Sequence, residues 1–338
     1  MLAAVVPVTT YGRIMTVTGQ FSAETATTGE WKRQANRFTG RITADSASGP
    51  GEGPDEAGRW PLEPGRYRLV VSLACPWAHR SVIVRRLLGL EDAISLAVVD
   101  PIRDSAGWRF TLDPDGRDPV LGIGYLAEAY RATDPDYAGR VTVPAIVDTL
   151  TGQVVTNDYP QITLDLSTEW GAHHRPGAPS LYPEERRGEL DPLMEDIYRD
   201  VNNGVYRCGF ATTQESYEGA YDALFARLDA LEERLADRRF LLGDALTEAD
   251  VRLFTTLVRF DAVYHGHFKA NRNKLTEQPN LWRYARELYA LPGFGDTVDA
   301  DHIKRHYYVT HDTINPTGIV PKGPDPAVWR DPAVWSTP

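Results

Sequence analysis

Cys75 is the residue best placed for nucleophilic chemistry, because it stands between a predicted strand and a predicted helix in the segment SLACPW, residues 72–77. The alternating, β-branched run over residues 66–73 predicts the strand. Pro76 is typical of a first helical position, where its missing N–H removes no intrahelical bond. The sulfur would then lie at a helix N-terminus, whose unpaired N–H groups and dipole favour an anion. Because the thiolate is the reactive form of cysteine, we expect a nucleophile with a depressed pKa.

The second cysteine, Cys208, has no comparable setting, and we expect it to be a packed structural thiol, as most free cysteines are. The two cysteines are too far apart for a Cys-x-x-Cys motif, and no resolving cysteine follows Cys75. The chemistry should therefore be monothiol, with a mixed disulfide that an external thiol reduces. The scarcity of cysteine fits a reducing compartment, and the sequence shows no signal peptide or membrane span, so we expect a cytoplasmic protein.

A second feature is the dipeptide Val143-Pro144 at the start of a predicted strand. Next to a strand–cysteine–helix turn, we expect this proline to be cis and to face the cysteine. The Val143 backbone would then be free to pair with a peptide-like thiol. The alternative is an ordinary proline at the first position of a strand.

The net charge and the incomplete histidine motifs argue against two other classes of function, nucleic-acid binding and metal binding. The chain has 36 basic and 47 acidic residues, a net charge of -11, which argues against a nucleic-acid partner. His173-His174 and His265-Gly266-His267 are spaced closely enough to suggest a metal, but no cysteine or carboxylate cluster completes a site. We therefore predict no metal ion.

The elements that must position these residues fall into two domains, as 338 residues would suggest. Residues 1–63 read as an extended arm and loop, with Trp31, Phe38 and Trp60 docking on the body. Residues 64–172 alternate as β-α-β-α-β-β-α, an α/β pattern with one antiparallel edge. After a Pro/Gly-rich break, residues 180–300 are helical, and residues 301–338 read as a tail packing on the body.

The helical part contains one especially clear helix start. Thr247 can cap free backbone N–H groups, Asp250 can reach back to it, and Leu246 can pack on Val251. A long amphipathic helix over residues 221–235 precedes this start, and a helix over residues 282–291 follows it and ends at a Pro-Gly pair.

Six segments of the chain resemble the glutathionyl-hydroquinone reductases, the Xi class of glutathione transferases. They are residues 72–80, 139–144, 202–206, 264–268, 301–308 and 315–321. The resemblance implies a thioredoxin-like α/β domain followed by an all-α glutathione-transferase domain. It also implies a homodimer formed through the helical domains, and reductive removal of a thiol from S-glutathionyl-hydroquinones.

The same resemblance implies roles for single residues. Cys75 would attack the thioether sulfur and expel the hydroquinone, and a second thiol would reduce the mixed disulfide. Tyr206 and Tyr307 would line the aromatic pocket and hydrogen-bond the quinol oxygens, stabilising charge that develops there. Without the resemblance, each tyrosine would be read as a core residue with its hydroxyl at water.

The thiol-binding residues follow from the resemblance in the same way. Trp108 would lie over the bound thiol, and Arg140 would meet a carboxylate. Val143, followed by Pro144, would pair with the peptide backbone.

One segment departs from the family pattern. The class carries Glu-Ser to hold the γ-glutamyl group, whereas this chain has Asp158-Tyr159. Asp158 can still pair with an ammonium group, but Tyr159 replaces a small hydroxyl with a bulky ring. We therefore expect no bound cofactor and either glutathione or mycothiol, which has no γ-glutamyl group, as co-substrate. The alternatives are a conjugating transferase, a general disulfide reductase or a non-catalytic binding scaffold.

Overall fold

The computed structural model describes residues 24–330, so residues 1–23 of the predicted arm and residues 331–338 of the predicted tail lie outside it. A four-stranded sheet is built from β3 (Tyr67–Val71), β4 (Ile94–Val98), β5 (Ala145–Asp148) and β6 (Val154–Thr156), in the order β4-β3-β5-β6. β3 and β4 are parallel, whereas β5 is antiparallel to both β3 and β6. The expected antiparallel edge is confirmed, because the edge strand β6 pairs antiparallel with β5. In addition, the inner strand β5 runs antiparallel to β3.

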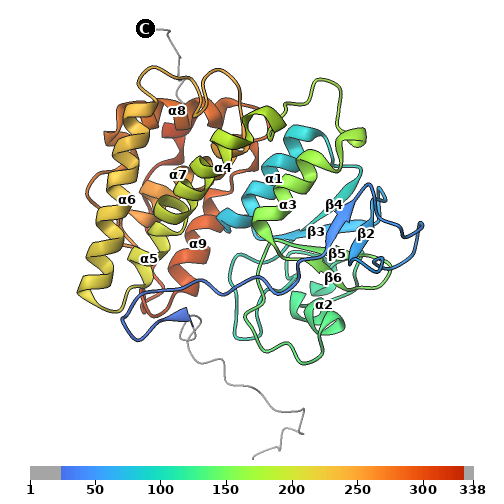
Figure 1. The fold of residues 1–338 in the computed structure, drawn as a ribbon. Coiled ribbons are helices and arrows are strands. Elements are labelled where there is room, and N and C mark those ends of the chain that lie inside the picture. Colours follow the sequence, from blue (N-terminus) through green and yellow to red (C-terminus); the bar gives the residue numbers. More distant parts are fainter. Residues whose placement is uncertain (1–23, 331–338) are drawn as a thin grey trace, which may run out of the picture.

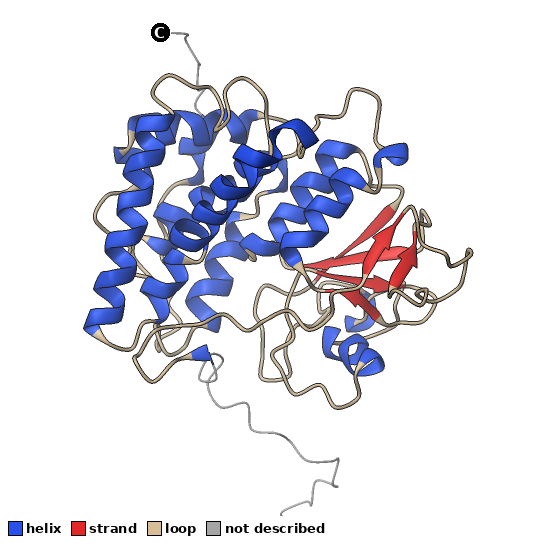
Figure 2. Ribbon diagram, in the orientation of Figure 1, coloured by secondary structure: helices blue, strands red, loops and turns tan. Residues whose placement is uncertain are grey.

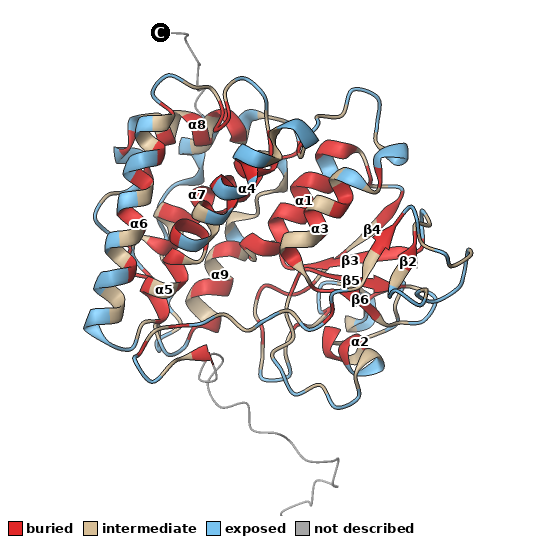
Figure 3. Ribbon diagram, in the orientation of Figure 1, coloured by how far each residue is buried: buried red, intermediate tan, exposed pale blue. Residues whose placement is uncertain are grey.

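Three helices flank this sheet (Figures 1 and 2). α1 (Pro76–Leu88) and α3 (Tyr159–Thr168) pack together on the face toward the helical half, and α2 (Leu126–Thr133) lies on the other side. α1 also packs on α7 of the helical half, so it is buried on almost every side (Figure 3). The start of α1 therefore lies where the two halves meet.

The helical half is assembled around α7, all twelve residues of which are buried. Its helices are α4 (Arg187–Asp196), α5 (Gly204–Phe210), α6 (Gln214–Arg234), α7 (Glu248–Arg259), α8 (Pro279–Ala290) and α9 (Ala300–Thr310), with π-helical turns η5 (Ile197–Asn202) and η6 (Phe260–Tyr264). Short 3₁₀ turns are η2 (Pro114–Gly116), η3 (Gly171–His173), η4 (Glu184–Arg186), η7 (Leu275–Glu277), η8 (Gly295–Thr297) and η9 (Pro326–Arg330). The capping box at Thr247 and Asp250 is confirmed. The predicted tail begins with α9, which buries Ile303 and Tyr307.

The arm runs across both halves and carries a small sheet that the sequence did not suggest. β1 (Arg41–Thr43) and β2 (Arg59–Pro61) pair in parallel. The expected docking of Trp31, Phe38 and Trp60 is confirmed, since all three are buried. Earlier in the arm, the carbonyl of Gly29 accepts a hydrogen bond from the backbone N–H of Thr212 in the helical half (Figure 1).

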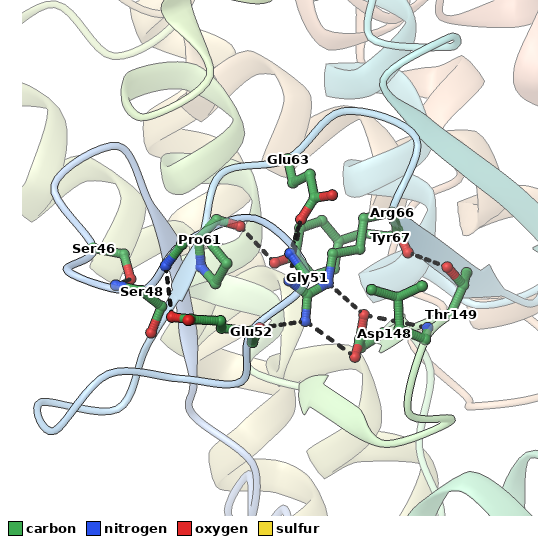
Figure 4. Close-up of polar contacts among 12 residues, drawn as sticks. Ser46, Ser48, Gly51, Glu52, Pro61, Glu63, Arg66, Tyr67, Asp148 and Thr149 are labelled. Carbon is green, nitrogen blue, oxygen red and sulfur yellow. Dashed lines mark hydrogen bonds and ion pairs between the residues drawn. The ribbon is translucent and has the colours of Figure 1, made fainter.

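Arg66 fastens the loop between β1 and β2 to the sheet (Figure 4). Its guanidinium pairs with the buried Asp148 at 2.7 Å and also donates to the Glu52 carbonyl at 2.7 Å and the Glu63 carboxylate at 3.2 Å. These polar contacts of Arg66 thus hold this part of the arm against the sheet. Among the described residues, no helix is both long and apolar enough to cross a membrane.

Candidate active site

Cys75 occupies the position that the sequence predicts, at the N-cap of α1 with Pro76 as the first helical residue. The Val143–Pro144 peptide bond is cis, as expected. The Cys75 thiol donates to the carbonyl oxygen of Val143 at 3.4 Å, so these two segments meet although they are far apart in the chain. The structure therefore brings together the turn that carries Cys75 and the cis proline directly before β5.

The expected depression of the Cys75 pKa is wrong for this arrangement. Burial raises the pKa of the thiol above its ordinary value. The backbone N–H groups of Ala78 and Trp77 lower it, as a helix N-terminus should, and the charges of Arg259 and Arg33 act in the same direction. Desolvation by burial is the largest of these effects.

A small cavity of about 60 Å³ lies against Cys75 at the junction of the two halves. Of the predicted site residues, seven line it: Cys75, Trp108, Arg140, Val143, Tyr159, Tyr206 and Tyr307. The other two lie just behind its wall. Pro144 is buried after Val143, and Asp158 is the N-cap of α3, next to Tyr159. The geometry thus assembles one site from residues of the sheet half and the helical half.

Tyr206 and Tyr307 line the cavity, and the buried Tyr264 lies behind them in the same hydrogen-bonded cluster. The hydroxyls of Tyr206 and Tyr307 share a hydrogen bond of 2.5 Å, and those of Tyr264 and Tyr307 share one of 2.8 Å. Burial raises the pKa of all three phenols, so they stay protonated and able to donate. Tyr264 lies in the segment 264–268 that resembles the family, but nothing in that segment alone separates it from a core residue.

Trp108 also lines the cavity, and its ring stacks on His306 at 5.2 Å between ring centroids. The Nδ1–H of His306 donates to the Pro101 carbonyl at 2.7 Å, which fixes the imidazole. Burial lowers the pKa of His306 to about 3, so the ring is neutral at pH 7. The arrangement presents a flat aromatic surface to whatever enters the cavity.

Arg33 of the arm is a site residue that the sequence reasoning missed. Its guanidinium lies 4.2 Å from the ring centre of Trp77, 4.8 Å from that of Trp31 and 4.9 Å from that of Tyr206. Such contacts are favourable because the faces of aromatic rings are electron-rich. The neighbouring Trp31 is the one local signal that this part of the arm reaches the site.

Two polar predicted residues already have partners from the arm. Arg140 Nη2 lies 2.8 Å from the Glu24 carboxylate, and Asn36 Nδ2 donates to the Asp158 carboxylate at 2.9 Å. Burial raises the pKa of Asp158.

Tyr159 separates the Cys75 cavity from a second one. Its ring is buried and packs on Trp77, with 4.7 Å between ring centroids. Beyond it lies a cavity of about 280 Å³, lined in part by Arg80, Tyr198 and Arg252. Tyr159 and Arg33 line both cavities.

Cys208 lies apart from this site. It is 2% exposed, and burial raises the pKa of its thiol to about 12, which is the setting of a structural cysteine. Within residues 24–330, no three His, Cys, Asp or Glu side chains lie together as a metal site would require.

Comparison with known proteins identifies the family. Models of the glutathione S-transferase N-terminal and C-terminal domains match residues 74–169 and 214–287. The chain is 43% identical over 308 residues to glutathionyl-hydroquinone reductase YqjG of Escherichia coli, covering 90% of this chain and 91% of that one. It is 47% identical over 266 residues to glutathionyl-hydroquinone reductase PcpF of Sphingobium chlorophenolicum, covering 78% and 84%. The chain belongs to the glutathionyl-hydroquinone reductases, the Xi class of glutathione transferases.

Solved structures agree with this membership of the Xi class. A glutathione transferase from Gordonia bronchialis is 59% identical, with a TM-score of 0.82 over 87% of this chain and 88% of that one. The Xi glutathione transferase from Phanerochaete chrysosporium is 42% identical, with a TM-score of 0.82 over 89% and 95%. The predicted fold class, a thioredoxin-like domain plus an all-α glutathione-transferase domain, is confirmed. The exact domain boundaries stay a prediction.

Proposed function

We propose that this Xi-class chain is a thiol-dependent reductase that removes the thiol from S-conjugated hydroquinones. The observation that carries the proposal is the placement of Cys75 in one cavity with the paired hydroxyls of Tyr206 and Tyr307. A thiol nucleophile and two phenol donors are the groups that a thioether on a hydroquinone ring requires.

The reaction has two steps. The Cys75 thiolate attacks the sulfur of the conjugate, a new S–S bond forms, and the bond from sulfur to the aromatic carbon breaks. That carbon takes up a proton before the bond breaks, which places the ring in a keto form; the electron pair of the broken bond then restores the aromatic ring, so the hydroquinone leaves and the thiol stays on Cys75. The thiolate of a second thiol molecule then attacks this mixed disulfide, which frees Cys75 and yields the disulfide of the thiol.

The tyrosine hydroxyls would support the first step. As the electron pair of the broken bond restores the aromatic ring from its keto form, negative charge develops on a quinol oxygen, and Tyr206 and Tyr307 can donate to it. Their raised pKa values keep both phenols protonated for this purpose. Trp108 offers the ring a flat aromatic surface in the same cavity.

The rival functions fit this site less well. A conjugating transferase must leave its thiol co-substrate free to attack, whereas Cys75 would capture the sulfur as a disulfide. A general disulfide reductase has no use for paired phenols. A binding scaffold needs no cysteine at a helix N-terminus.

The co-substrate is a low-molecular-weight thiol. A structure of YqjG from Escherichia coli, 44% identical to this chain, contains glutathione, which makes glutathione the first candidate. Mycothiol is the second candidate, because the buried ring of Tyr159 occupies the place where the class carries the serine of Glu-Ser. We also propose a cytoplasmic homodimer formed through the helical domains, which sedimentation analysis of the full chain would test.

Mass spectrometry tests the proposed reaction. Incubation with a glutathionyl-hydroquinone, without a second thiol, should release free hydroquinone and leave the thiol attached to Cys75 in equal amount. Cys75→Ser should release none, and the matched variant Cys208→Ser should behave as wild type because Cys208 is buried away from the site. Comparable losses for both variants at equal folded fraction would refute the assignment.

A further inference from the structure

The arm neutralises the carboxylate-binding end of the thiol site. Glu24 is 7% exposed, and its Oε1 accepts from Arg140 Nη2 at 2.8 Å. Gln34 holds the same pair: its backbone N–H donates to Glu24 at 2.6 Å, and its amide oxygen accepts from the Arg140 backbone N–H at 2.8 Å. A ligand carboxylate that displaced Glu24 would leave a buried carboxylate without its cation, which is strongly unfavourable.

The arm also occupies the ammonium-binding end. Asn36 donates to the Asp158 carboxylate at 2.9 Å. Burial raises the pKa of Asp158, so its charged form is less favoured where an incoming ammonium group would need it. The next residue, Tyr159, packs its ring on Trp77. It therefore offers no small hydroxyl group that could hold a second ligand carboxylate.

The cavity beyond Tyr159 has the chemistry of a site for hydroxyl groups. Its volume of about 280 Å³ exceeds the space next to Cys75, and both donors and acceptors line it, among them Arg80, Glu195 and Arg252. Arg252 is already paired with the buried Glu248 at 2.9 Å. Arg80 is 1% exposed, and its Nε has no hydrogen-bond partner within the described part of the chain. A hydroxyl group can accept from such a guanidinium and donate to the carboxylate of Glu195, so a ligand rich in hydroxyl groups can pair with both kinds of lining group.

We propose that Glu24 and Asn36 select the thiol co-substrate: they fill the two ionic ends of the site, so it takes an uncharged, hydroxyl-rich thiol. The hydroxyl-bearing part of that thiol enters the cavity beyond Tyr159, and its sulfur reaches Cys75. This inference rests on the proposed thiol-dependent reaction and adds the class of thiol to it.

The test compares three reductants with one hydroquinone conjugate: glutathione, mycothiol and dithiothreitol. Wild type should show a kcat/KM for mycothiol at least tenfold above that for glutathione. Glu24→Gln removes the negative charge and leaves Arg140 available for a carboxylate. This variant should raise the ratio of kcat/KM for glutathione to kcat/KM for dithiothreitol about tenfold, which is the scale of one hydrogen bond to a charged group.

Two further variants distinguish the effect of removing the Glu24 charge from the effect of disturbing the packing of the arm. Glu30→Gln is the matched control. Glu30 is also an arm residue that pairs with an arginine, Arg207 of α5 at 3.3 Å, but it does not line the cavity. It should leave the ratio unchanged. The double variant Glu24→Gln/Arg140→Gln should lose the gain for glutathione, because no cation remains to meet the carboxylate.

The outcomes distinguish this inference from the proposed function. A wild type that uses glutathione as well as mycothiol, or an equal ratio in Glu24→Gln and Glu30→Gln, overturns the inference and leaves the reductase intact. A gain that persists in the double variant overturns it as well. If no hydroquinone is released with any of the three thiols, dithiothreitol included, the proposed function itself fails and the inference fails with it. Circular dichroism of each variant excludes loss of fold, and thermal shift with glutathione gives a readout of binding without turnover.

Discussion

Nε of Arg259 donates a hydrogen bond to the carbonyl oxygen of Ala74 at 2.9 Å, directly before Cys75. A second nitrogen of the same guanidinium donates to the Leu73 carbonyl at 3.0 Å. Arg259 is fully buried at the end of α7, and no carboxylate pairs with it among residues 24–330. One cation of the helical half thus orients the turn that carries the nucleophile and leaves its charge uncompensated beside it.

The first prediction concerns this charge. Burial raises the Cys75 pKa and Arg259 lowers it, so Arg259→Met should raise the pKa further. Less thiolate would then exist at a given pH, and the midpoint of the pH profile for alkylation by iodoacetamide should move upward. Arg259→Lys keeps the charge and should shift the midpoint less.

The control for this profile is Arg272→Met, which removes an exposed guanidinium paired with Asp229. Its alkylation midpoint should equal that of wild type. Equal midpoints for Arg259→Met and wild type would mean that Arg259 only holds the two halves together.

The second prediction concerns the tyrosine wall. Tyr206→Phe and Tyr307→Phe should lower turnover on hydroquinone conjugates about 10²-fold or more, the usual loss for a donor that stabilises developing charge. Reduction of a small alkyl disulfide should suffer far less, because it has no quinol oxygens. Tyr264→Phe should have a smaller effect, since Tyr264 reaches the site through Tyr307 and does not line the cavity. Equal losses on both substrates would show that the tyrosines are structural.

Local sequence signals predicted the parts of the fold that local physics determines. The turn at Cys75 follows from a strand, a proline and helix periodicity within a short segment, and the start of α7 follows from the spacing of Thr247 and Asp250. Neither depends on distant residues. The resemblance to a known family supplied the roles of Tyr206 and Tyr307, which periodicity alone would have assigned to the core.

The missed features are contacts between distant segments. Glu24 meets Arg140, and Arg33 meets Trp77, because the arm crosses the junction of the two halves. Charged residues in a Gly- and Ser-rich stretch give no signal of such a path, since a solvated arm would have the same composition. The expected depression of the thiol pKa was wrong for a related reason: the helix N-terminus is visible in the sequence, whereas the desolvation that raises the pKa depends on how the chain folds around the sulfur.

The third prediction concerns stability. The buried carboxylate of Asp250 accepts hydrogen bonds from the Leu241 backbone at 2.9 Å, the Thr247 backbone at 2.8 Å and the Tyr284 hydroxyl at 2.9 Å. Asp250→Ala leaves these buried donors without a partner and should lower the free energy of unfolding by about 3 kcal/mol. Urea denaturation measures the change, with the exposed Glu233→Ala as a control expected to lie within about 0.5 kcal/mol of wild type. A similar small change for Asp250→Ala would contradict the capping role.

The last prediction concerns the ring of Tyr159, the first residue of α3. The ring is 7% exposed and packs against Trp77, so a γ-glutamyl group cannot lie there without moving it. Tyr159→Ser should therefore lower KM for glutathione while raising KM for mycothiol, because the wall between the two cavities is lost and a small hydroxyl appears. Tyr198→Phe is the control: Tyr198 lines the second cavity only, so its hydroxyl should matter for mycothiol and not for glutathione. Steady-state kinetics with both thiols decides the matter. If wild type uses glutathione at least as efficiently as mycothiol and Tyr159→Ser changes neither, the ring has no part in choosing the thiol.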